Sequence, residues 1–207
     1  DCVDHDILLS RLEISFGFTG PALGWIRSYL SGRRQYVRYG GSTSITAPVL
    51  FGVPQGSVFG PLFFVLYTAD AFRIAEELDF SIHGYADDLQ IYDHCFVRDT
   101  QQLNDRLVHC IDCMGQWMRR NRLKLNAAKT EFIWLGSVRR LATRSFGPIV
   151  VNGEVVRPSL TVRDLGVIID PAISFADHVA ELARNCYFQI RQLRSIRSSP
   201  RVTPRRS

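Results

Sequence analysis

Two adjacent carboxylates, Asp87 and Asp88, have the clearest chemical potential in this sequence. Short apolar stretches at 80–84 and 89–92 flank them, which predicts two strands joined by a tight turn that carries both acids. Neighbouring negative charges repel each other and lose solvation in apolar surroundings, so something positive is expected to offset both costs. Mg²⁺ binds one or two protein carboxylates together with substrate phosphates. The pair therefore predicts a magnesium site, with a plain polar turn as the alternative.

A glycine- and proline-rich segment, 51–61, lies upstream of the acidic pair. Its three glycines and two prolines indicate a constrained loop, and Pro61 suits the first turn of a long buried helix. Gly56 would let a substrate or another backbone approach closely, while Gln55 and Ser57 offer hydrogen-bond donors and acceptors. An ordinary turn before a core helix would explain the same residues.

The composition favours a globular protein with a polyanionic partner. A length of 207 residues allows one good core or two modest ones, and the 46% hydrophobic and 22% charged content argues against disorder. Nearly all of the positive charge behind the net +5 is arginine, because Lys124 and Lys129 are the only lysines. Arginine offers a planar fork of donors that suits phosphates. For Arg33, Arg34 and Arg38, phosphate contact and a solvated strand face remain equal alternatives.

The five cysteines give no disulfide framework, because their number is odd and their spacing irregular. That suits a reducing compartment. Cys110 and Cys113 form a C-x-x-C within a helical pattern, which predicts buried thiols rather than zinc ligands. No apolar run reaches the roughly 18 residues that span a bilayer, and the start lacks the basic region of a secretory signal. We therefore expect an intracellular protein of the nucleus, the cytoplasm or both, with no membrane partner.

Hydrophobic periodicity predicts an α+β fold, with helices packed on one face of a mixed sheet. Helices are predicted at about 7–12, 21–30, 61–77, 100–118 and 174–199. Beyond the acidic hairpin, hairpins are predicted at 36–50 and 150–156, and single strands at 131–135 and 162–169. From Leu182 onward the last helix and the tail hold seven arginines and no acid.

Taken in order, the motifs of the chain resemble reverse transcriptases of non-LTR (LINE-type) retrotransposons, over essentially its whole length. They are Gly52-Val53-Pro54-Gln55-Gly56-Ser57, Tyr85-Ala86-Asp87-Asp88 and Leu125-Asn126-x-x-Lys129-Thr130, with Asp4-His5 and Arg163-Asp164-Leu165-Gly166 as flanking matches. The resemblance implies a right-hand polymerase palm, an antiparallel sheet with packing helices, plus the start of the thumb and no fingers. Residues 1–157 would be a partial palm, and 158–207 a primer-grip-like strand and the beginning of the thumb helix.

The implied activity is RNA-directed DNA synthesis, in which deoxynucleoside triphosphates extend a DNA primer on an RNA template. Asp87 would bind two catalytic Mg²⁺ ions, which Mn²⁺ could replace, and Asp88 would contribute more peripherally. Lys129 would lie near the leaving pyrophosphate. Tyr85 would pack near the primer terminus.

The remaining roles that the resemblance implies concern the nucleic acid. Gln55, Gly56 and Ser57 would position the templating base and the incoming nucleotide. Leu165 and Gly166 resemble the primer grip, and the arginine-rich last helix would track the duplex backbone.

The resemblance also implies a third carboxylate, in an Asp-x-x-x-Ala-Phe-Asp pattern whose last residue matches Asp1. The first Asp of that pattern and the aromatic residue that excludes the ribose 2′-hydroxyl are not in this sequence, which starts without Met. Asp4 and Asp6 follow the motif and do not replace them. We therefore expect a piece of a longer protein with little or no polymerase activity by itself.

Two other functions compete with this interpretation. One is a retroelement relic that binds nucleic acid without catalysis. The other is an RNA polymerase that copies RNA, against which the Gly-Val-Pro-Gln-Gly-Ser loop argues. Phe59, Ala69 and Leu89 stand where the family more often has Leu, Asn and Thr, which bears on activity rather than on fold.

Overall fold

The computed structural model describes residues 3–54, 56–142 and 146–197. Helices and strands are mixed along the chain, as the sequence predicts. The chain forms two compact units: the first comprises residues 1–130 and 149–155, and the second comprises residues 131–148 and 156–207.

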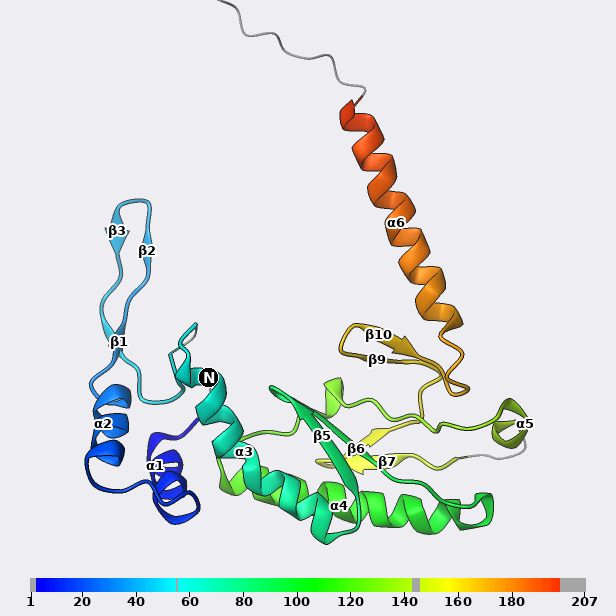
Figure 1. Cartoon of the computed structure of the whole chain (residues 1–207), viewed down its shortest axis with the longest axis horizontal. Coiled ribbons are helices and arrows are strands. Elements are labelled where there is room, and N and C mark those ends of the chain that lie inside the picture. Colours follow the sequence, from blue (N-terminus) through cyan, green and yellow to red (C-terminus); the bar gives the residue numbers. More distant parts are fainter. Residues whose placement is uncertain (1–2, 55, 143–145, 198–207) are drawn as a thin grey trace, which may run out of the picture. The chain divides into compact units, whose positions relative to one another are not determined.

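The first unit opens with two helices and a long β-ribbon. Asp4 caps α1 (His5–Ile14), because its side chain accepts hydrogen bonds from the backbone N–H groups of Asp6 and Ile7. α2 (Gly20–Leu30) follows, with a proline in its first turn. The ribbon then pairs β1 (Arg34–Gln35) with β4 (Ala47–Pro48), and β2 (Arg38–Tyr39) with β3 (Ser42–Thr43), both antiparallel (Figure 1). The hairpin predicted at 36–50 is confirmed.

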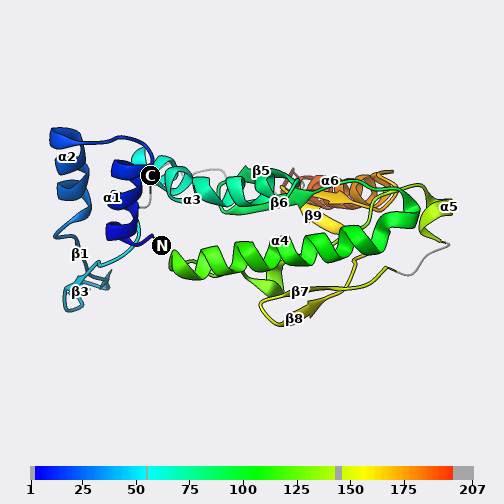
Figure 2. The same cartoon turned by 90° about the horizontal axis from the view of Figure 1, so that it is seen from below.

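Two long helices and the acidic hairpin complete most of the first unit. They are α3 (Phe59–Glu77), β5 (Ser81–Tyr85), β6 (Asp88–Tyr92), the short helix η1 (Val97–Asp99) and α4 (Thr100–Arg120). The helix η2 (Ala127–Lys129) and the hairpin of β7 (Ile149–Val151) with β8 (Glu154–Val156) follow. α3 contacts both α4 and β5, and α4 also contacts β7 (Figure 2). α3 therefore packs against both α4 and the acidic hairpin.

The core of the first unit lies between α1, α2 and α3. Its buried side chains are Val3, Leu8, Leu9, Leu12, Leu23, Ile26, Leu30, Phe63 and Tyr67. These positions recur at three- and four-residue steps, so each helix turns one apolar stripe inward. The predicted stripe of α4 is buried in the same way, at Leu103, Cys110, Ile111, Met114 and Met118.

A half-buried arginine links three helices of this unit through its side chain. Arg11 of α1 donates hydrogen bonds to the backbone oxygen of Tyr67 at 2.6 Å and to Oδ1 of Asn121 at 2.7 Å, and pairs with Asp70 at 3.2 Å. Its guanidinium lies over the ring of Trp117, 4.9 Å from the ring centroid. Asn121, which ends α4, also accepts a hydrogen bond from the Tyr67 hydroxyl. The polar groups of this interior therefore satisfy one another.

The second unit contains the last hairpin and the last helix. α5 (Val138–Leu141) precedes β9 (Val162–Asp164) and β10 (Val167–Ile169), which pair antiparallel, and α6 (Ala176–Arg197) contacts β10 (Figure 1). Residues 198 and 199, predicted to end this helix, lie outside the described residues.

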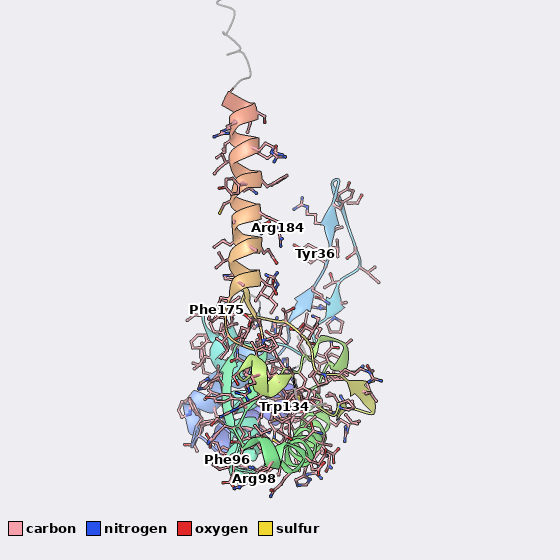
Figure 3. All side chains as sticks on the ribbon, turned by 90° about the vertical axis from the view of Figure 1, so that its right-hand side faces the viewer. Tyr36, Phe96, Arg98, Trp134, Phe175 and Arg184 are labelled. Carbon is pink, nitrogen blue, oxygen red and sulfur yellow. The ribbon has the colours of Figure 1, made fainter. Side chains whose placement is uncertain are left out.

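Two strand predictions in the second unit are wrong. The segment 162–169 is a hairpin rather than one strand, because Leu165 and Gly166 have φ angles of 44° and 88° and reverse the chain. The segment 131–135 forms only a single parallel bridge, between Phe132 and Pro158. Its aromatic rings pack instead, with Phe132 edge-on to Trp134 (Figure 3 labels Trp134).

The strands described in residues 3–54, 56–142 and 146–197 form five separate two-stranded sheets. Each strand has two to five residues and a single partner. A broader antiparallel sheet is therefore not assembled within these residues. In the same part of the chain, no helix is both long enough and apolar enough to cross a bilayer.

The start of α6 is held by two carboxylates with lowered pKa values. Asp170 accepts hydrogen bonds from the N–H groups of Ala172, Ser174 and Phe175 and from the Ser174 hydroxyl, and the backbone bond from Ser174 lowers its pKa most. The pKa of Glu181 is lowered chiefly by the hydrogen bond that Arg163 donates at 2.7 Å. Both contacts depend on the ionised carboxylates.

Acid is therefore expected to release the start of α6. Because the folded pKa values of Asp170 and Glu181 lie below the unfolded ones, their stabilisation is complete above the ordinary carboxyl pKa and disappears as the pH falls through the folded values, below about pH 4. The amide NMR signals of residues 172–175 would report the loss in a pH titration. Asp170→Asn should make those signals insensitive to this pH range, and Asp112→Asn, on α4, should leave the titration unchanged. An Asp170→Asn titration like that of the wild type would contradict the assignment.

Candidate active site

The acidic turn of the first unit has the predicted geometry. In the β5–β6 hairpin Tyr85 pairs with Asp88, which leaves Ala86 and Asp87 as a two-residue turn. Ala86 has a φ of 55°, a value that favours glycine and costs another residue about 1–2 kcal/mol. A positive φ at the first turn position is typical of type II′ hairpins, whose twist matches that of the strands. The backbone strain therefore lies next to the candidate catalytic residue.

Both carboxylates of this turn are open to solvent. Asp87 and Asp88 are exposed, and neither carboxylate has a hydrogen bond or an ion pair within the described part of the chain. The apolar surroundings expected from the sequence are therefore absent, and no described side chain offsets their charge. Two exposed oxygen donors fit a hard divalent cation, which completes its shell with water or phosphate oxygens. The described residues contain no group of three or more His, Cys, Asp or Glu side chains that could hold a metal.

α3 supports the hairpin from behind through a glycine contact. A Cβ atom added to Gly84 of β5 would lie 2.5 Å from Cζ of Phe72 on α3, and 3.2 Å from a methyl group of Leu89. The first distance is too short for two carbon atoms and the second is tight, so only glycine lets the strand approach the ring this closely. The Phe72 ring therefore fixes the distance between α3 and the strand that leads to Asp87.

Gly84→Ala is expected to destabilise the first unit by about 1–3 kcal/mol, because the added methyl group must displace the Phe72 ring or the strand. Urea unfolding would measure the loss, and adding Phe72→Leu should recover part of it. Gly24→Ala is the matched control: that glycine lies in α2 with open space around it, so alanine should stabilise the helix slightly. Equal effects of the two alanine variants would contradict the contact.

The loop before α3 is held by its own hydrogen bonds. The Ser57 hydroxyl donates to the backbone oxygen of Pro54 at 2.7 Å and accepts from the Gly60 N–H at 3.0 Å. Its only proton is thus used within the loop. Gly56 is exposed, has a φ of 75° and has open space where a Cβ would lie, whereas Gln55 lies outside the described residues. An approaching ligand would therefore meet the Gly56 backbone.

Two residues that sequence reasoning did not assign to the site anchor this loop. His5 Nε2 lies 2.8 Å from the Gly52 backbone oxygen, and Arg33 donates to the same oxygen at 3.0 Å. The backbone N–H of Gly52 donates to the Val3 oxygen at 2.8 Å. The flanking Asp-His motif is the only signal that could have suggested His5. The acceptor is the backbone oxygen of Gly52, and no sequence pattern indicates that a backbone oxygen is contacted.

The other candidate residues are distributed over both units. Tyr85 is exposed at the end of β5, and Lys129 is exposed at the end of η2, in the same unit as Asp87. Leu165 and Gly166 form the tip of the β9–β10 hairpin in the second unit.

Comparison with known proteins decides the family. The reverse transcriptase (RNA-dependent DNA polymerase) family model matches residues 1–169. The chain belongs to this family.

Relatives of this reverse transcriptase chain come from mobile elements, which confirms the resemblance to non-LTR retrotransposons. It is 32% identical to a probable RNA-directed DNA polymerase from transposon BS of Drosophila melanogaster, over 94% of this chain and 21% of the relative. It is 29% identical to the RNA-directed DNA polymerase from mobile element jockey of Drosophila funebris, over 76% of this chain and 17% of the relative. The chain thus spans about a fifth of the length of such relatives. No solved structure matches it significantly.

Two of the three positions at which the sequence is predicted to depart from the family pattern, Phe59 and Leu89, make local packing contacts. Phe59 opens α3 with its ring stacked on Phe63, 5.7 Å between centroids, and edge-on to Trp25 at 5.3 Å. Leu89 is half-buried against Gly84. Both side chains therefore support local packing.

The prediction that both thiols of the C-x-x-C in α4 are buried is confirmed for Cys110 but not for Cys113. Cys110 is fully buried, and burial raises the pKa of its thiol to about 11, so it is protonated and inert at neutral pH. Cys113 is half-exposed, and its Sγ lies 3.8 Å from Nε2 of His109. The helix turns the two thiols towards different surroundings because they are three residues apart.

Proposed function

We propose that this chain is the nucleotidyl-transfer portion of an RNA-directed DNA polymerase, in which the first unit acts as part of a palm. The observation that carries the proposal is the placement of two exposed carboxylates at the tip of a hairpin that α3 supports. The same helix begins directly after the Gly56–Ser57 loop. One rigid element thus links the proposed metal-binding turn to the proposed nucleotide-positioning loop, as catalysis by positioning requires.

Asp87 and Asp88 would hold Mg²⁺, with Mn²⁺ as a possible substitute, and their exposed oxygens suit either ion. The bound metals would lower the charge barrier between the primer 3′-hydroxyl and the triphosphate. The protein's own task is to present the carboxylates rigidly, which the tight turn and the Phe72 contact achieve. Tyr85, on the same strand end, would pack against the primer terminus.

The loop and the lysine would act on the two ends of the nucleotide. The Ser57 hydroxyl keeps the loop closed, so the exposed Gly56 backbone, together with Gln55, would contact the base pair being formed. Lys129 would offer its exposed ammonium group to the leaving pyrophosphate.

The second unit would hold the product duplex. The Leu165–Gly166 tip of the β9–β10 hairpin would contact the primer, and α6 would begin the thumb. Arg184 and Arg191 are exposed on α6, where they would contact phosphates in a sequence-independent way (Figure 3 labels Arg184).

Primer extension on an RNA template tests the proposal. Because the described residues offer two carboxylates and no group of three metal-binding side chains, we would compare this chain with an extended chain. The extended chain carries, before residue 1, the corresponding upstream segment of the transposon BS relative. We expect the extended chain to incorporate deoxynucleotides in a Mg²⁺-dependent reaction, and this chain by itself to be at least tenfold slower. A folded extended chain that binds primer–template but makes no product would overturn the proposal in favour of a non-catalytic relic.

A further inference from the structure

The β-ribbon, residues 33–49, lies in a part of the chain that is free of negative charge. Between Glu13 and Asp70 the sequence has no Asp or Glu, and its four charged residues are Arg27, Arg33, Arg34 and Arg38. Three of these four arginines lie within the ribbon. A ribbon that carries only positive charges attracts polyanions and repels other cationic surfaces.

The ribbon exposes aromatic rings that no packing explains. Tyr36 and Tyr39 are 59% and 87% exposed, and neither ring lies against another ring of the described residues (Figure 3 labels Tyr36). Val37 and Ile45 are exposed beside them. Large rings are costly to leave in water, so an exposed aromatic group on a protruding ribbon indicates a binding surface.

The arginines of the ribbon differ in their contacts. Arg33 is fixed, because it donates a hydrogen bond to the backbone oxygen of Gly52, in the loop before α3. Arg34 and Arg38 are exposed and have no ion pair within residues 3–54, 56–142 and 146–197. Their guanidinium groups are therefore available for a ligand, and Arg33 couples the ribbon to the loop that would position the nucleotide.

We propose that the ribbon binds a single-stranded segment of nucleic acid, with Tyr36 and Tyr39 stacking on bases and Arg34 and Arg38 contacting phosphates. Exposed rings stack only on bases that are free of a duplex, whereas a duplex would use the arginines alone. A second copy of the chain is a poor occupant, because an isologous contact would bring the arginines of two ribbons together. That the bound strand is the unpaired RNA template rests on the proposed function; the binding itself does not.

The stacking part is tested by fluorescence anisotropy with the 207-residue chain and a labelled oligoribonucleotide of about 10 nucleotides. EDTA and the omission of triphosphates separate binding from polymerisation. We expect Tyr36→Ala/Tyr39→Ala to weaken single-strand binding about 10- to 100-fold and to leave binding of a duplex of equal length unchanged. Tyr36→Phe/Tyr39→Phe keeps both rings and should bind as the wild type does. Equal losses for single strand and duplex, or an unchanged affinity of the alanine variant, would overturn the proposal.

The phosphate part is tested by the salt dependence of the same binding. Each phosphate contact of a single strand contributes about 0.7 to the slope of log K against log salt, so Arg34→Gln/Arg38→Gln should lower that slope by about 1.4. Arg27→Gln/Arg120→Gln removes the same charge from exposed positions of the first unit outside the ribbon and should leave the slope unchanged. A slope that falls equally in both double variants would mean nonspecific attraction and would overturn the assignment. Either failure leaves primer extension by the extended chain intact, so it is distinguishable from failure of the polymerase proposal.

Discussion

Replacing Arg11 by methionine is expected to lower the free energy of unfolding of the first unit by about 2–4 kcal/mol. The guanidinium donates two charge-assisted hydrogen bonds, to the Tyr67 and Asn121 oxygens, and each such bond contributes about 1.5–3 kcal/mol. The methionine side chain keeps part of the packing, and Asp70, 30% exposed, can return to water, so the loss is smaller than the sum. The buried Asn121 and Tyr67 oxygens lose those donors.

The arginine variants are best compared by urea unfolding of the whole chain, with tryptophan fluorescence as the probe of unfolding. Arg11→Lys keeps a charge but only one compact donor group, so it should be intermediate. Arg73→Met is the matched control, because Arg73 pairs with the same Asp70 but is 68% exposed, and such pairs contribute at most about 1 kcal/mol. If Arg73→Met cost as much as Arg11→Met, the guanidinium of Arg11 would not be the link between the helices.

The Arg11 network is also what the sequence could not predict. Hydrophobic periodicity alone predicts that a charged residue such as Arg11 faces the solvent. Its neighbours Leu9 and Leu12 are residues of α1 that the pattern assigns to the core. In the structure burial lowers the pKa of Arg11, and the charge of Asp70 partly opposes that effect. Only the folded arrangement, with Tyr67 and Asn121 opposite each other, shows why a cation is tolerated there.

Local signals did predict the elements where they were strong. The helix predicted at 100–118 is confirmed as α4, which begins at Thr100, because its long apolar stripe recurs at three- and four-residue steps. The hairpin predicted at 150–156 is confirmed, and Asn152 and Gly153 of its turn have φ angles of 51° and 85°. The turn within 162–169 is not predicted, because leucine rarely adopts a positive φ and only Gly166 of the two turn residues indicates a reversal.

The acidic turn was predictable, but its support was not. Asp87 and Asp88 stand out as a pair between two β-prone stretches, and their hairpin is as predicted. The Phe72 contact behind Gly84 and the anchoring of the Gly52 oxygen join residues that are far apart in the sequence. Such contacts depend on how α1, α3 and the hairpin pack, and no local pattern encodes them.

The largest effect on activity is expected from Asp87→Asn in the extended chain, which should slow primer extension by about 10³-fold or more. A neutral amide oxygen is a poorer ligand for a hard dication, and losing metal stabilisation of the transition state removes several kcal/mol. Asp88→Asn should cost less, because that carboxylate is proposed to contribute more peripherally. Neither change should alter stability by more than about 0.5 kcal/mol, since both side chains are exposed without partners in the described residues.

Two further measurements make the Asp87 prediction specific to metal binding. Titration with Mn²⁺, followed by its paramagnetic effect on water relaxation, should show weaker binding for Asp87→Asn than for the unsubstituted extended chain. Asp112→Asn removes the same charge from an exposed site on α4 and should leave both extension and Mn²⁺ binding unchanged. Apart from Asp88, which is proposed to contribute more peripherally, residues 81–92 of the hairpin contain no acid that could replace the lost carboxylate. Full activity of Asp87→Asn would therefore place the metal elsewhere and remove the basis for the proposed active site.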